Sequence, residues 1–286
     1  MHEIRFSCRA VVAAMALAVC VAAAPPTATS APAPTYADLA DLSDAADLVV
    51  HAKIAKAIAV PAERAANVAP GRARVYIEAE TLGLIAGSAP LGESIRYLVD
   101  VPLDAKGKIP KLKKREVLLF ARAVAGRPGE LQLVGPNAQL DWNPALDARV
   151  KPILADLALR DAAPAITGIR DALSVAGTLA GESETQVFLG TRSGDPVSLT
   201  VIRRPGMAPT WGVSFGEIVD QAARPPERET LAWYRLACFL PGQLPAGANL
   251  AQDSASRSRA AEDYRFVMQQ LGPCPRNLAA ETLAAR

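Results

Sequence analysis

The chain has 286 residues, of which half are hydrophobic and 5% are aromatic, and its 31 basic side chains nearly balance 29 acidic ones. The net charge of +2 excludes a protein that attracts nucleic acid or an anionic membrane through its overall field. The length is sufficient for one large domain or for two smaller ones, each with its own hydrophobic core.

The N-terminus predicts export from the cytosol. Residues 1–24 begin with a basic head containing Arg5 and Arg9, continue with an uncharged apolar stretch and end on small residues. Such a stretch is too short to span a bilayer and is typical of a secretory signal peptide. We expect cleavage at 25–33. The alternative is lipidation of Cys20, whose preceding residues resemble a lipobox except for the adjacent valine. Both alternatives predict a periplasmic or secreted protein with no transmembrane segment in the mature chain.

An N-terminal domain is expected over residues 36–162, after a proline-rich linker at 25–35. It begins with a short helix that carries Leu39, Leu42 and Ala46 at helical spacing. Five strands then follow, at Val50–Ile54, Val75–Thr81, Ile95–Val101, Val117–Ala121 and Leu131–Val134. Lys56 interrupts the alternation after the first strand and predicts a bulge.

Residues 163–286 predict a smaller α+β domain. Before it, Asn143 followed by Pro144 predicts the start of a helix that reaches about Arg160. Short β-like runs then occur at Asp171–Thr178, Thr185–Thr191, Val197–Arg203 and Thr210–Phe215. Two helices are expected to close the chain, at Thr230–Leu240 and Ser256–Leu271.

The cysteines predict one disulfide. Cys238 and Cys274 are the two that remain once the leader is removed, and in an exported chain two cysteines most simply pair with each other. Free thiols are the alternative, but neither cysteine has a neighbouring histidine that would activate it. His51 is then the one histidine of the mature chain, so a zinc site of the usual kind is excluded. We expect no metal and no cofactor, and no glycine-rich loop has phosphate-binding spacing.

Two segments carry resemblances to known families. Five strands with a lysine-bearing loop before the fourth resemble an OB-type barrel. The order of Asp47–Val50, a second strand and then Val117–Phe120 is similar to the netrin-like and metalloprotease-inhibitor-like barrels of secreted proteins, over about residues 45–135. The inhibitor family blocks a protease metal with an N-terminal cysteine. A proline-rich linker and a helix stand in that place here, so the resemblance implies the fold and not that activity.

The second resemblance covers the whole chain. The segments YLVDVPLDAKGK at 97–108 and TLAWYRLAC at 230–238 are similar to a family of secreted proteins from sphingomonad-type bacteria. That family has no assigned activity, so the likeness implies no function.

A hydrolase motif occurs at Gly212–Gly216, where the sequence GVSFG matches the G-x-S-x-G nucleophile elbow. The hydrolase family needs a histidine after the serine, and none follows Ser214. We therefore interpret the match as a glycine-punctuated strand and expect no catalytic residue. Acidic residues that could act as an acid–base pair are Glu182, Glu184, Glu217 and Asp220, and we interpret them as solvated strand ends.

A basic cluster is the strongest local feature of the chain. It gathers five of the eight lysines within nine residues, and an arginine extends it: Lys106, Lys108, Lys111, Lys113, Lys114 and Arg115. Such a cluster is typical of contact with polyanions, although a solvated hairpin whose lysines deter edge pairing is the alternative. The sequence therefore predicts an exported, non-enzymatic protein that binds a protein partner or an anionic surface. A hydrolase of unrecognised type is the alternative function.

Overall fold

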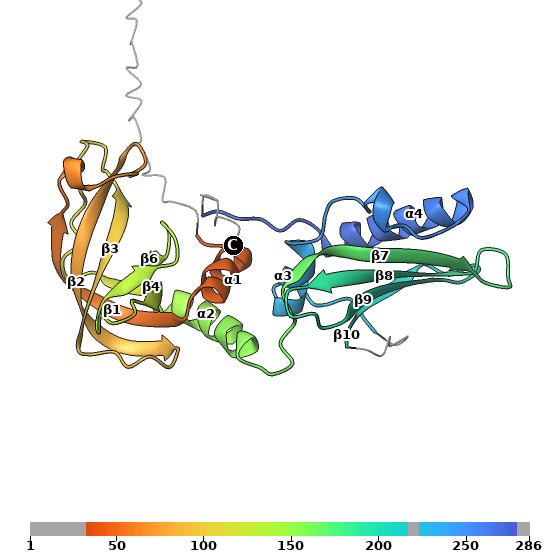
Figure 1. The fold of residues 1–286 in the computed structure, drawn as a ribbon, viewed down its shortest axis with the longest axis horizontal. Helices are drawn as coiled ribbons and strands as arrows, with labels where there is room; N and C mark the ends of the chain where they lie inside the picture. Colours follow the sequence, from red (N-terminus) through yellow and green to blue (C-terminus); the bar gives the residue numbers. More distant parts are fainter. Residues whose placement is uncertain (1–32, 217–222, 279–286) are drawn as a thin grey trace, which may run out of the picture. The chain divides into compact units, whose positions relative to one another are not determined.

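The computed structural model describes residues 33–216 and 223–278, which form an α+β fold with two antiparallel sheets (Figure 1). The signal peptide that we predict at 1–24, the predicted lipidation site Cys20, and the acidic residues Glu217 and Asp220 lie outside the described residues. Within the described ranges, no helix is long and apolar enough to cross a membrane.

The first sheet has six strands in the order β3-β2-β1-β4-β5, with β6 paired to β4. The strands are β1 (Leu48–Ala59), β2 (Arg72–Ala86), β3 (Ser94–Pro102), β4 (Glu116–Ala123), β5 (Leu131–Leu133) and β6 (Gln139–Asp141). All five predicted strands are present, and the short β6 was not predicted. The register between β1 and β2 shifts between Ile54 and Lys56, which confirms the predicted bulge.

This sheet is not the closed five-stranded barrel that we expected. The end strands β3 and β5 lie close to each other. Among the described residues they are linked by one isolated parallel bridge, between Arg96 and Glu130, and not by a continuous ladder. Further along, the guanidinium of Arg72 donates to the carbonyls of Asp100 (2.6 Å) and Pro136 (3.1 Å). A side chain therefore occupies the space where a closing ladder would run, and with a β5 of three residues the sheet stays open.

One face of the first sheet forms a core. Val75 and Ile77 of β2 pack with Ile95, Tyr97 and Val99 of β3, and all of them are at most 4% exposed. They alternate along their strands with polar or exposed residues, as a sheet with one buried face requires. Burial of its phenol raises the pKa of Tyr97 well above the ordinary value, while its hydroxyl donates to Gln139 (2.8 Å).

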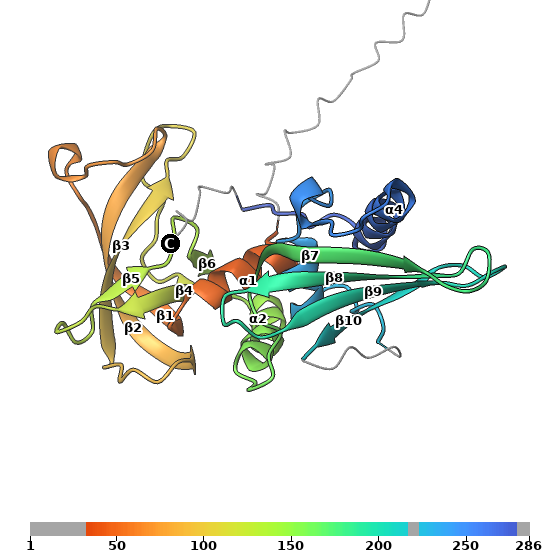
Figure 2. The same cartoon turned by 45° about the vertical axis from the view of Figure 1, so that its right-hand side comes forward.

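The second sheet has four strands in the order β10-β9-β8-β7. They are β7 (Ile166–Ala176), β8 (Ser183–Thr191), β9 (Val197–Arg203) and β10 (Thr210–Phe215). Both predicted C-terminal helices are present, as α3 (Leu231–Ala237) and α4 (Ser254–Leu271). Helix α4 packs along the sheet beside β7 and β8 (Figures 1 and 2).

A second hydrophobic core joins elements from both halves of the sequence. It includes Leu39 of α1 (Tyr36–Ala45) and Ile153 of α2 (Pro144–Leu157), together with Leu199, Leu236 and Tyr264 from the C-terminal half. Asn143 caps α2 by accepting from the amide of Leu146 (2.9 Å), as predicted.

An ion pair links helices α1 and α3. Arg235 of α3 is 5% exposed and donates to both carboxylate oxygens of Asp44 at 2.8 and 2.7 Å. Burial is the largest single effect on the pKa of Arg235 and would lower it, but the hydrogen bond to Asp44 and the charge of that carboxylate, together with smaller effects of Tyr234 and Tyr36, outweigh burial, so the pKa is raised and the guanidinium stays charged. Arg235 also donates to the carbonyl of Ala163 (3.1 Å), at the start of the C-terminal half.

Two further aspartates of α1 hold the C-terminal segment 275–278. Asp38 accepts from the amides of Asn277 (2.9 Å) and Leu278 (3.2 Å), and Asp41 accepts from the guanidinium of Arg276 (2.6 Å). Cys274 directly precedes this segment and is bonded to Cys238, so the predicted disulfide, which joins residues 36 positions apart, ties the segment to the end of α3.

The disulfide is expected to contribute substantially to stability. In the chain-entropy model, a loop of this length stabilises the fold by about 3–4 kcal/mol. A Cys238→Ala/Cys274→Ala variant should therefore unfold at lower denaturant concentration than the parent, measured by chemical denaturation. Equal midpoints for the variant and the parent would contradict the prediction.

The Asp44→Asn variant should also be destabilised, by about 2–3 kcal/mol, because it leaves the buried guanidinium of Arg235 without a counter-charge. Lys151→Gln provides the control, since Lys151 is 58% exposed and its ion pair with Asp147 lies within one helix. Thermal unfolding of both variants tests the difference. An equal loss of stability in the two would show that the Arg235–Asp44 pair contributes no more than an exposed ion pair.

Candidate functional site

The predicted basic cluster lies on the connection between β3 and β4, residues 103–115, which we call the basic loop. Its first part is a tight turn built by Asp104, whose carboxylate accepts from the amides of Lys106 and Lys108, both at 2.8 Å. The backbone of Asp104 also bonds that of Lys108 (2.8 Å), and Gly107 supplies the positive φ of +69° that the turn requires.

The second part of the basic loop is anchored to the first sheet. Leu112 is 4% exposed and packs in the core of that sheet. The amide of Lys114 donates to the carbonyl of Ile54 (2.8 Å), and the amide of Ile54 donates to Arg115 (2.9 Å). Lys114 has a φ of +72°, a conformation that a lysine rarely adopts and that surrounding contacts must hold.

All five lysines of the basic loop are exposed, and within residues 33–216 and 223–278 none of them forms an ion pair. Arg115 differs, because it pairs with Asp141 at the end of β6. The single carboxylate of the loop, that of Asp104, already accepts two backbone amides. The structure therefore presents the lysines as uncompensated positive charges and uses Arg115 to attach the loop to the sheet.

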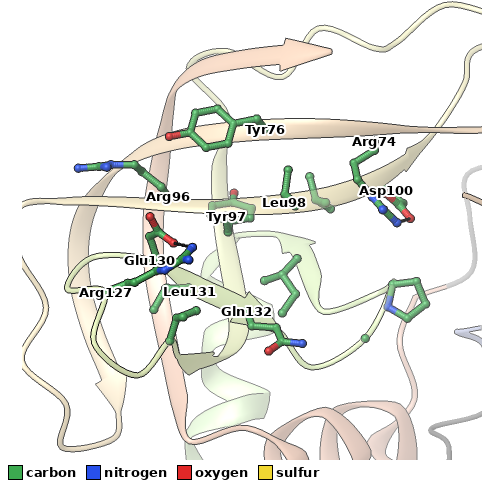
Figure 3. A pocket seen from close by; sticks show the side chains of 15 residues that line it. Arg74, Tyr76, Arg96, Tyr97, Leu98, Asp100, Arg127, Glu130, Leu131 and Gln132 are labelled. Atoms are coloured by element: carbon green, nitrogen blue, oxygen red, sulfur yellow. Dashed lines mark hydrogen bonds and ion pairs between the residues drawn. The ribbon is translucent and has the colours of Figure 1, made fainter. Parts of the chain in front are cut away.

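A groove that we did not predict lies between β3 and β5 (Figure 3), and we call it the β3–β5 groove. It has a volume of about 690 Å³. Leu98 lies in its wall and is 50% exposed. The Arg74–Asp100 ion pair, with two contacts of 2.8 Å, lies at one end, and Arg96 lies at the other.

One sequence signal could have indicated the β3–β5 groove. Leu98 lies between Arg96 and Asp100 on the polar face of its strand, where alternation calls for another polar residue. The neighbouring ion pair between Arg127 and Glu130 (3.3 Å) comes from the turn between β4 and β5, so its position could not be derived from β3 alone.

The G-x-S-x-G motif lies at the end of a strand with buried side chains. Ser214 is 7% exposed and forms part of β10, whereas a nucleophile elbow exposes its serine on a sharp strand-to-helix turn. Gly212 has a packing role, because a Cβ there would overlap the backbone carbonyl of Ala223. The glycine therefore lets residues 223–224 cross the strand, where the amide of Val213 donates to Arg224.

His51 lies in β1 of the other sheet, where two neighbouring side chains hold its ring. Its Nε2 contacts a carboxylate oxygen of Glu116 (3.1 Å), and its ring stacks on Trp142 with 4.3 Å between centroids. The structure therefore does not bring His51 together with Ser214.

The acidic residues Glu182 and Glu184 have local partners. A carboxylate oxygen of Glu182 accepts the amide of Leu179 (3.2 Å), and one of Glu184 accepts the side-chain amide of Gln186 (2.8 Å). In the part of the chain that the structure describes, no three His, Cys, Asp or Glu side chains gather as a metal site would require.

Comparison with known proteins does not assign a function. No protein-family model matches the chain, and no curated protein is significantly similar to it in sequence. The candidate sites are therefore argued from their own geometry.

Substitutions in the GVSFG motif should separate packing from catalysis. Gly212→Ala should destabilise the protein by about 2 kcal/mol or more, because the added Cβ overlaps the chain at Ala223. Ser214→Ala should leave unchanged any ester or peptide hydrolysis that the purified protein shows, and a fluorophosphonate probe should not label Ser214. Thermal unfolding and mass spectrometry measure these effects, and a labelled Ser214 would restore the hydrolase alternative.

Proposed function

We propose that the chain is an exported, non-enzymatic protein that binds polyanionic surfaces through the basic loop. The observation that carries this proposal is the set of five exposed lysines on one anchored connection, none of which has an ion pair with another described residue. The ligands that fit are groups with clustered phosphates or sulfates, such as the headgroups of an anionic glycolipid or an anionic polysaccharide.

The anchoring of the basic loop supports binding over a plain solvated hairpin. Leu112 is buried, and Lys114 keeps a positive φ although glycine would be more favourable there. A lysine in that conformation lowers the stability of the fold. We infer that it is kept because its positive charge strengthens the binding of anions by the cluster. A hairpin that merely deters edge pairing also uses lysines, but it does not need one at a position with a positive φ.

Export is the second part of the proposal. The signal-like N-terminus and the Cys238–Cys274 disulfide support a periplasmic or secreted location, because disulfides persist in oxidising compartments. The likeness to an OB-type fold is also proposed. It is supported by the strand order β3-β2-β1-β4-β5 and by the parallel bridge between the end strands.

Replacement of Lys111, Lys113 and Lys114 with glutamine should weaken retention of the mature protein on a heparin column, so that it elutes at lower salt. Exposed charges are screened over about 10 Å at 0.1 M salt, so the parent itself should elute at moderate salt. The matched control replaces three exposed arginines outside the loop, Arg64, Arg160 and Arg204, with glutamine. It has the same net charge, so equal elution of the two variants would show that only overall charge matters.

The single variant Lys114→Gly tests the strained position directly. It should raise the free energy of unfolding by up to about 1 kcal/mol, because glycine adopts a φ of +72° without a steric penalty. It should at the same time lower the salt concentration of elution from heparin. A variant that is more stable and yet equally retained would mean that Lys114 contributes nothing to binding.

A further inference from the structure

We propose that a pocket between α4 and the β7–β8 hairpin binds a small zwitterion, a molecule that carries a phosphate or carboxylate group beside an ammonium group. We call it the α4 pocket. It has a volume of about 640 Å³ and is lined by residues 176–183 of the hairpin, Arg203 of β9, and Ala255, Ser258, Arg259 and Glu262 of α4. The site belongs to the second sheet, so it is separate from the basic loop and does not rest on the function proposed for that loop.

A buried polar network holds two arginines of the α4 pocket. Its members Asp263 and Thr185 are completely buried, and Ser174 is 3% exposed. The Nε of Arg203 donates to one carboxylate oxygen of Asp263 (2.5 Å), and the hydroxyl of Thr185 contacts the other (2.5 Å). The hydroxyls of Thr185 and Ser174 are in contact (2.8 Å), and that of Ser174 accepts from the Nε of Arg259 (3.0 Å). The network therefore connects one arginine to the other.

Packing alone does not explain this network. Helix α4 already contributes Tyr264, Val267 and Leu271 to the hydrophobic core, and replacing buried ionic groups with apolar side chains of similar volume is often neutral or stabilising. The network does fix the direction of the arginines. Each is attached through its Nε, so the two Nη groups at the end of the side chain lie farther from the network, on the side of the pocket that both residues line.

The Nη groups of the two arginines are available to an oxyanion. Those of Arg203 have no hydrogen-bond partner among the described residues, and one Nη of Arg259 donates to Ser256 (3.0 Å). Guanidinium groups bind phosphate and carboxylate through short, charge-assisted hydrogen bonds, often two at a time. We therefore place the oxyanion of the ligand between Arg203 and Arg259.

The remaining charges of the α4 pocket select a zwitterion. Asp263 follows Arg259 by four residues but pairs with Arg203, so Arg259 has no ion pair in the described part of the chain. Glu262 is exposed and is unpaired in the same sense, while the carboxylate of Glu182 accepts the amide of Leu179 within the hairpin turn. An anion alone would be repelled by both glutamates. A ligand with an ammonium group beside its oxyanion complements Glu262 as well as the arginines.

Binding can be tested with three probes that separate the two charges: O-phosphoethanolamine, ethyl phosphate and ethanolamine. An NMR titration of the mature protein should show saturable binding of phosphoethanolamine, with a dissociation constant of about 1 mM for a site open to water. Ethyl phosphate should bind more weakly and ethanolamine least. Equal binding of phosphoethanolamine and ethyl phosphate, or no saturation by phosphoethanolamine up to about 10 mM, would overturn the proposal. A parallel titration with β-alanine shows whether a carboxylate replaces the phosphate.

Removal of one guanidinium tests the oxyanion contact. Arg259→Gln should weaken binding of phosphoethanolamine by about tenfold, because a charge-assisted hydrogen bond is lost. The matched control is Arg257→Gln, since Arg257 lies on the same helix, donates to the carbonyl of Gln252 and does not line the pocket. Arg203→Lys should also weaken binding, and it keeps a counter-charge for Asp263, so the variant folds. Equal affinities of the Arg259→Gln and Arg257→Gln variants would exclude a site at Arg259.

The exposed glutamate gives a test in which two effects have opposite signs. Glu262→Gln should weaken phosphoethanolamine by about threefold and strengthen ethyl phosphate by a similar factor, because it removes one exposed carboxylate. General damage to the fold would weaken both ligands. Weakening of both, or no change in either, would exclude the ammonium contact with Glu262.

The position of the NMR changes separates this site from the basic loop. Phosphoethanolamine should shift the amide signals of Arg259 and Glu262, and its affinity should be unchanged when Lys111, Lys113 and Lys114 are replaced with glutamine. Shifts confined to the basic loop would exclude the α4 pocket and leave the polyanion proposal intact. The two sites therefore fail independently.

Discussion

The ion pair between Asp44 and Arg235 is the interaction on which the arrangement of helices α1 and α3 depends. Asp44 lies in the last turn of α1, where the helix dipole disfavours a negative charge, and no basic residue of α1 itself offsets it. Arg235 offsets it with two hydrogen bonds, while Arg122 of β4 donates to the carbonyl of Ala45 (2.7 Å) at the same helix end. Two arginines that are far apart in sequence therefore complete one short N-terminal helix.

The same helix explains why the C-terminal segment has a defined path. Asp38, Asp41 and Asp44 follow one another at intervals of three residues and so lie along one side of α1. Asp41 accepts from both Arg276 and the hydroxyl of Tyr234 (2.6 Å), and this burial beside a carboxylate raises the pKa of Tyr234. The disulfide limits the positions that Cys274 can reach, and the aspartates select one of them.

The sequence predicts helices and strands well, because their signals lie within a few neighbouring residues. It predicts poorly whether the first sheet closes into a barrel, because that depends on contacts between residues far apart in the chain. Alternating apolar residues located β2 and β3, and the Asn143 cap located the start of α2, because each pattern acts within a few residues. Whether β3 and β5 join depends instead on Arg72, a residue of β2 whose side chain bonds β3 at Asp100 and the connection after β5 at Pro136. The five lysines of the basic loop were likewise visible as a cluster, but the pairing of Arg115 with Asp141 requires the short strand β6, which has no clear pattern of its own.

The edge of β3 that faces β5 is protected although the sheet does not close. Natural proteins protect free strand edges with charged side chains, prolines or bulges, because unpaired backbone groups recruit other chains. On β3, the amide of Arg96 donates to Gly129 and the carbonyl of Asp100 accepts from Arg72, while Leu131 of β5 packs in the same core as Tyr97 and Val99. Arg72 therefore holds one end of this edge and the Arg96–Glu130 bridge holds the other, so that a β5 of three residues is sufficient to cover the strand between them.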